Sequence, residues 1–125
     1  MDFNDWIGKS VSKRDTMAPE QLRRFEAMLN HRAETISEGD ALTLCSHWAY
    51  FTPVLPQSEL TVQGYPRHSD LLPQIEQSSR LWLGGRLQFK HDLRIGTFST
   101  CHTTITDIKS DGDEDNKVYL SLQHQ

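Results

Sequence analysis

Two adjacent glycines, Gly84 and Gly85, lie between Trp82 and a stretch in which apolar and polar residues alternate. An ordered chain keeps such a pair where φ must be positive, or where another segment or a ligand comes very close. Earlier in the chain the aromatic residues of 48–51 are followed by Pro53, which is typical of the end of a buried element. Together these features predict an antiparallel sheet that wraps closely around a short aromatic helix.

Length and charge narrow the class of protein. A chain of 125 residues predicts one domain over 1–125, and the hydrophobic content of 36% indicates a modest core. The net charge of −4 argues against nucleic acid as a partner, because phosphate binding needs excess Lys and Arg. No apolar run approaches the ~20 residues of a membrane span. The first five residues carry acid where a targeting peptide would carry base, so we expect an intracellular, cytoplasmic protein, or the mitochondrial matrix in a eukaryote.

Hydrophobic periodicity predicts two helices in the first half. Residues 3–7 form an apolar clip, and Pro19–Leu29 has apolar residues at helical spacing with Glu26 toward water. A polar loop covers 31–40, and 41–51 is expected to be a buried helix. The proline-rich stretch from 53 to about 79 is too long for an ordinary loop, and its leucines indicate that it packs on something.

The second half predicts strands. Residues 86–92 alternate, 97–108 are rich in Thr and Ile, and 118–122 alternate again, with turns at Gly96 and 110–113. The expected fold class is therefore α+β. Because the chain stops at or near its last strand, an open sheet edge would need a partner.

The sequence predicts no metal site and no cofactor. Acids recur in 111–115 as in a calcium loop, but Asn116 replaces the required glycine and Leu122 the required glutamate. The histidines show no metal-ligand spacing, and the glycine pair lacks a phosphate-loop pattern. Cys45 and Cys101 are expected to be reduced, buried thiols.

Candidate ligand-binding residues cluster around the aromatic run and the glycine pair. They are His47, Trp48, Arg80, Trp82, Gly84 and Gly85. A histidine on an apolar element is more often a core or pocket-lining residue than a catalyst. Arg80 could meet a carboxylate or phosphate, or simply lie on the surface.

The ordered motifs resemble the N-terminal hot dog domain of MaoC-like acyl-thioester hydratases, near the itaconyl-CoA and mesaconyl-CoA hydratases and the mitochondrial hydroxyacyl-thioester dehydratases. The matching stretches are Asp-Phe-Asn-Asp-Trp-Ile-Gly at 2–8, His-Trp-Ala-Tyr-Phe-Thr-Pro at 47–53, Gln-Gly-Tyr-Pro-Arg at 63–67, Leu-Leu-Pro at 71–73, Arg-Leu-Trp-Leu-Gly-Gly-Arg-Leu-Gln-Phe at 80–89 and Leu-Arg-Ile-Gly at 93–96. The resemblance implies a hot dog fold that lacks its last strand or strands. It implies that Trp48 and Trp82 pack together and makes the glycine pair a structural hinge.

The catalytic Asp-x-x-x-x-His motif of that family is absent from this chain. No catalytic residue is therefore assigned, and whether the chain is an enzyme stays open. One hypothesis is a half-site domain of an acyl-CoA or acyl-carrier-protein hydratase/dehydratase, which shapes the thioester tunnel and the dimer surface. Its partner would be a second copy or a separate catalytic hot dog chain. The alternative is a stand-alone thioester-binding or dimerisation module without activity.

Overall fold

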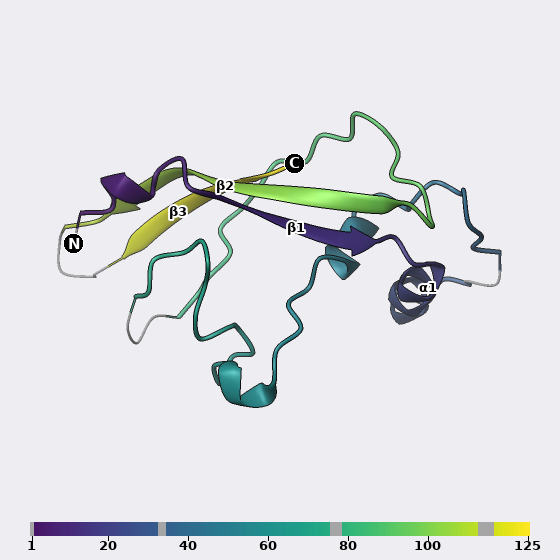
Figure 1. The fold of residues 1–125 in the computed structure, drawn as a ribbon, viewed down its shortest axis with the longest axis horizontal. Coiled ribbons are helices and arrows are strands. Elements are labelled where there is room, and N and C mark those ends of the chain that lie inside the picture. The colour runs from purple at the N-terminus through teal and green to yellow at the C-terminus, as the bar shows by residue number, and fades with distance from the viewer. Residues whose placement is uncertain (1, 33–34, 76–78, 113–116) are drawn as a thin grey trace. The chain divides into compact units, whose positions relative to one another are not determined.

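The computed structural model describes residues 2–32, 35–75, 79–112 and 117–125, and it is an α+β fold (Figure 1). Three strands form one sheet in the order β1-β2-β3. The elements, with η for a 3-10 turn, are η1 (Asn4–Trp6), β1 (Ser10–Thr16), α1 (Pro19–Met28), η2 (Ser46–Ala49), η3 (Gln57–Glu59), β2 (Phe98–Ser110) and β3 (Val118–His124). No helix in these ranges is both long and apolar enough to cross a membrane.

The β2–β3 hairpin confirms the two strands predicted at 97–108 and 118–122. The antiparallel register runs from Thr103 opposite His124 to Ser110 opposite Val118. Most of the turn, residues 113–116, lies outside the described residues, so the calcium-loop question is not addressed there. Strand β1 was not predicted, because Val11 is its only large apolar residue and gives no alternating pattern.

Helix α1 confirms the helix predicted at 19–29. Pro19 starts it, where its missing N–H costs nothing, and Leu22 is buried. The buried face differs from the prediction, however, because Glu26 is 6% exposed whereas Met28 is 72% exposed. The helix ends at Met28, and Asn30, two residues beyond, has φ of 62°, a left-handed conformation that asparagine tolerates better than most residues.

The helix predicted at 41–51 is wrong. Only the single turn η2 forms there, and it lies between Cys45 and Phe51, which have φ of 69° and 58°. The start of the segment pairs with another part of the chain instead, through a β-bridge between Ala41 and Arg94. Pairing of this backbone with 93–95 replaces the helical hydrogen bonds that the apolar pattern suggested.

Contacts divide the chain into two compact units with separate cores. The first comprises Met1–Lys13, Pro53–Ser78 and Cys101–Gln125. Its core consists of Leu71, Ile105 and Ile108, against which the N-terminal clip residues Phe3 and Trp6 pack, as predicted. Leu71 and Leu72 show that part of the long connection does pack on a core.

The second unit comprises Arg14–Thr52 and Ser79–Thr100. Its core is formed by Met17, Leu22, Leu42, Tyr50 and Ile95. The Tyr50 hydroxyl donates to the Ala18 carbonyl at 2.7 Å, and this bond fixes the end of η2 against the start of α1. The candidate site belongs to this unit.

Candidate functional site

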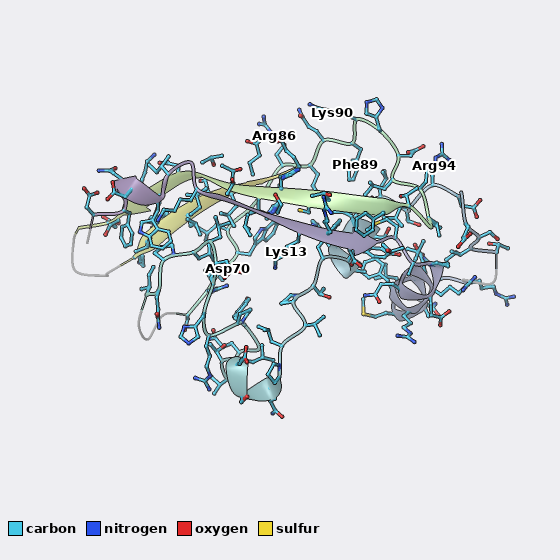
Figure 2. The ribbon with its side chains drawn as sticks, in the orientation of Figure 1. Lys13, Asp70, Arg86, Phe89, Lys90 and Arg94 are labelled. Atoms are coloured by element: carbon cyan, nitrogen blue, oxygen red, sulfur yellow. The ribbon has the colours of Figure 1, made fainter. Side chains whose placement is uncertain are left out.

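A shallow hollow in the second unit brings together two segments about fifty residues apart. It is open to solvent, and its cavity volume is only about 30 Å³. Its lining residues are Leu42, Thr43, Leu44, His47, Phe89, Asp92 and Leu93. The ring centroids of His47 and Phe89 lie 6.2 Å apart in an edge-to-face arrangement, and Figure 2 labels Phe89 on the second of these segments.

Backbone hydrogen bonds hold the two segments side by side. Leu42 N–H donates to the Leu93 carbonyl at 2.7 Å, and Ile95 N–H donates to the Asp40 carbonyl at 2.9 Å. The buried Ser46 hydroxyl donates to the Thr43 carbonyl at 2.5 Å, which ties η2 back onto the same wall. His47 is therefore held on an anchored turn.

The chemistry of the hollow is apolar with a few polar groups. Four of its side chains are Leu or Phe, and the polar ones are Thr43, His47 and Asp92. This composition suits an apolar ligand with a polar head that can accept or donate hydrogen bonds. Asp92 was missed by the sequence reasoning, because no motif links it to a histidine 45 positions earlier. Its Oδ2 lies 3.6 Å from Nη2 of Arg94.

Of the predicted binding residues, the structure places His47 in the hollow and Trp48 beside it. The His47 and Trp48 rings are 5.5 Å apart, but Trp48 is 59% exposed. Arg80 and Trp82 do not line the hollow, and Trp82 is 79% exposed. Among the described residues the Trp48 and Trp82 rings make no contact with each other, so the expected packing of Trp48 against Trp82 is wrong.

The interpretation of the glycine pair also needs correction. Neither Gly84 nor Gly85 is among the residues with positive φ. A Cβ at Gly84 would meet nothing within 4 Å, and one at Gly85 would meet only Trp82 Cζ2, at an ordinary 3.5 Å. Within this structure neither backbone geometry nor close approach requires a glycine, and the pair shows no sign of a ligand cradle.

A carboxylate–histidine pair, also missed from the sequence, lies at the end of α1. Glu26 Oε2 and His31 Nδ1 are 2.5 Å apart. His31 N–H donates to the Glu26 carbonyl and Asn30 N–H to the Ala27 carbonyl, at 2.9 and 3.0 Å, which is a Schellman cap. This cap folds His31 back over Glu26.

The nearby Thr43 hydroxyl and His31 hold the pKa of Glu26 below its ordinary value, in spite of burial. The carboxylate is therefore ionised near neutral pH. Its Oε1 is buried without a hydrogen-bond partner. Neither Glu26 nor His31 lines the hollow, so we interpret the pair as a clamp on the helix terminus behind the Thr43 wall.

Both cysteines are free and half-buried, so the reduced state is as predicted but the full burial is not. In the ranges that the structure describes, no group of three His, Cys, Asp or Glu could hold a metal ion.

The fold and the ordered motifs define a class, the MaoC-like hot dog hydratases and dehydratases, and comparison with known proteins gives the family. A family model described as hydroxyacyl-thioester dehydratase type 2 matches residues 45–124. A mesaconyl-C(4)-CoA hydratase of Chloroflexus aurantiacus is 33% identical over 95 residues, which is 76% of this chain. The chain belongs to the hydroxyacyl-thioester dehydratase type 2 family. The match covers 34% of that relative, so the chain spans about a third of its length.

Proposed function

We propose that this chain is a half-site hot dog domain of an acyl-CoA or acyl-carrier-protein hydratase/dehydratase, which shapes the acyl-thioester tunnel and the dimer surface. The observation that supports the proposal is the hollow, which leucine side chains line and in which the His47 and Phe89 rings meet edge to face. A short acyl chain is apolar and its thioester carbonyl is a hydrogen-bond acceptor. The leucines would contact the first, while the His47 imidazole offers a donor to the second.

The motifs of the chain support a role as one part of an active site that a second domain completes. Hydration of an enoyl thioester needs a group that activates water, a proton source for the α-carbon and a donor at the thioester oxygen. The chain lacks the Asp-x-x-x-x-His motif that supplies the first two in this class. A second hot dog chain that carries the motif would complete the site.

One observation favours a different candidate function. Asp92 lines the same hollow as His47. A carboxylate and an imidazole are the components of an acid–base site, and with them the chain could hydrate a small enoyl thioester by itself. The remaining alternative is a stand-alone thioester-binding or dimerisation module.

Loss of enoyl-thioester absorbance separates the three functions. The 125-residue chain is assayed with crotonyl-CoA and mesaconyl-CoA, alone and mixed with a hot dog chain that carries Asp-x-x-x-x-His. The half-site proposal predicts no turnover alone, and turnover in the mixture above that of the catalytic chain by itself. Turnover by the isolated chain that is lost in both His47→Gln and Asp92→Asn would replace it with the acid–base site.

Binding without turnover in either preparation would leave the stand-alone module. His47→Gln should then weaken binding of a non-reactive acyl-CoA about tenfold, because one hydrogen bond between uncharged groups and the packing of the imidazole ring are lost. The matched control is His102→Gln, because His102 lies in the first unit on β2, with Nδ1 2.6 Å from the Ser12 hydroxyl.

A further inference from the structure

The turn η2, which carries His47, lies between two residues with a left-handed backbone. Cys45 precedes it with φ of 69°, and Phe51 follows it with φ of 58°. Neither residue is a glycine, and a left-handed Phe is uncommon because its Cβ crowds the backbone. Such residues persist only where the surrounding structure holds them, and they concentrate at active sites and ligand clamps. Other groups must therefore keep the turn in this conformation.

Two side chains from other elements of the second unit hold the end of the turn. Asp15, on β1, accepts the Phe51 N–H at its Oδ2, at 2.9 Å. Gln21, in the first turn of α1, donates from Nε2 to the Ala49 carbonyl at 2.6 Å. Both bonds are partly buried, and they join residues 36 and 28 positions apart in the sequence. They are therefore tertiary contacts and not part of the turn itself.

The chemistry of each bond requires the side chain that makes it. The Asp15 carboxylate uses both oxygens, because its Oδ1 accepts the Thr16 N–H at 2.8 Å. An amide at this position would have only one oxygen for the two N–H donors. The carbonyl at the end of a helical turn has no partner within the turn, so Gln21 supplies the missing donor to Ala49.

The turn connects these bonds to His47. Ala49 is two residues after His47, and Tyr50 N–H donates to the His47 carbonyl at 3.1 Å. The Ser46 hydroxyl ties the other end of the turn to the wall of the hollow. Because the turn is held at both ends, the imidazole stays edge to face with the Phe89 ring, at 6.2 Å between centroids.

Neither Asp15 nor Gln21 lines the hollow. We propose that both are positioning residues for His47, which act through the backbone of 49–51 to keep its ring against Phe89. Their importance for ligand binding rests on the proposed function, whereas the position of the ring does not. A role limited to stability would leave the His47 ring of the folded chain where it is.

The ring resonances of the folded 125-residue chain test the positioning. Ring currents of Trp48 and Phe89 shift the His47 Cε1–H resonance from its unfolded-chain value, and His47→Gln assigns the signal. Gln21→Met keeps the length and helix preference of the side chain but cannot donate. It should return the resonance at least halfway to the unfolded-chain value. Asp15→Asn should act in the same direction, because one N–H loses its acceptor.

Asp40→Asn is the matched control. It makes the same charge change on an exposed carboxylate of the same unit, which accepts the Ser37 N–H at 3.0 Å. Its His47 resonance should stay at the wild-type position. A folded Gln21→Met variant with the wild-type resonance would overturn the proposal, and so would an equal shift in Asp40→Asn. If Asp15→Asn does not fold, Gln21→Met alone decides.

A double-mutant cycle with a non-reactive acyl-CoA tests the consequence for binding. Gln21→Met should weaken binding about threefold in the wild-type background and not at all in the His47→Gln background, because Gln21 acts through that imidazole. Equal weakening in both backgrounds would overturn the positioning role in binding. Absence of binding by the wild-type chain would instead refute the proposed function, and the His47 resonance would still decide the positioning.

Discussion

Two nearby stretches of the second unit, residues 81–91 and residues 93–97, differ in how their backbones are paired. In the second stretch Ile95 is 3% exposed, and its backbone bonds to Asp40 and Gly39. Gly96 and Thr97 are bonded to Met17. In residues 81–91 Trp82 is 79% exposed and no backbone group is bonded within the described chain. Ile95 is the only buried residue of 93–97, so the two stretches differ chiefly in backbone pairing, which accompanies the burial of Ile95.

The hollow lies where these two stretches meet. Leu93 comes from the second stretch and Phe89 from the first, and Asp92 lies between the two.

The largest difference should appear on truncating one apolar side chain in each stretch. Ile95→Ala truncates a side chain of the core that also contains Met17 and Leu22. It should lower the free energy of unfolding by about 2–5 kcal/mol. Leu83→Ala, at 70% exposure, should change it by no more than about 0.5 kcal/mol. Urea unfolding of both variants is the measurement, and equal losses would break the comparison.

Charged groups offer the second contrast. Glu26→Gln weakens a buried, charge-assisted bond to His31 and should cost roughly 1–3 kcal/mol. Lys90→Gln, with no ion pair among the described residues, should cost almost nothing. The measurement is again urea unfolding at neutral pH. If Glu26→Gln left the free energy of unfolding unchanged, the clamp would not stabilise the unit.

The pH dependence of Glu26 follows from its lowered pKa. In the unfolded chain Glu26 has its ordinary pKa of 4.5, whereas in the folded chain its pKa is lower. Its stabilising contribution is thus complete above pH 4.5 and is lost as the pH falls through the folded pKa. Between neutral pH and acid, wild type should lose more stability than Glu26→Gln. Parallel curves would contradict the assignment.

Alanine substitutions at two glycines, Gly96 and Gly84, should give the smallest difference in stability between the two stretches. Gly96 has φ of +89°, and a Cβ there would meet Glu38 Cγ at 3.3 Å. Gly96→Ala should cost roughly 1–2 kcal/mol, mainly from the left-handed backbone, because the Glu38 side chain can move aside. Gly84→Ala should be neutral or slightly stabilising, since it meets nothing and restricts the unfolded chain. Thermal unfolding of the two variants is the measurement. A larger loss of stability in Gly84→Ala than in Gly96→Ala would contradict the account.

Local patterns predicted the parts of the fold whose partners lie nearby in sequence. Helix α1 carries its own periodicity and start signal, and β2 and β3 lie close to each other in the sequence. The pattern misled at 41–51, where a bridge between Ala41 and Arg94 outcompeted the helix. It also misled at 86–92, where a true strand pattern has no neighbour in the described chain.

The site was predictable only in part. His47 was found because it stands in an aromatic run, but its companions Phe89 and Asp92 are brought to it by long-range pairing of Leu42 with Leu93. Glu26 looked like a surface residue of an amphipathic helix until the Schellman cap placed His31 against it. Neither juxtaposition leaves a spacing that sequence alone would reveal.

Hydrogen exchange of the isolated 125-residue chain at neutral pH tests the central contrast most directly. The amides of Leu42, Ile95 and Gly96, which donate within the unit, should exchange far more slowly than the unfolded-chain rate. Those of 81–91 should exchange at close to the unfolded-chain rate. Protection of 81–91 equal to that of Ile95 would show that these amides are hydrogen-bonded, and would contradict the account.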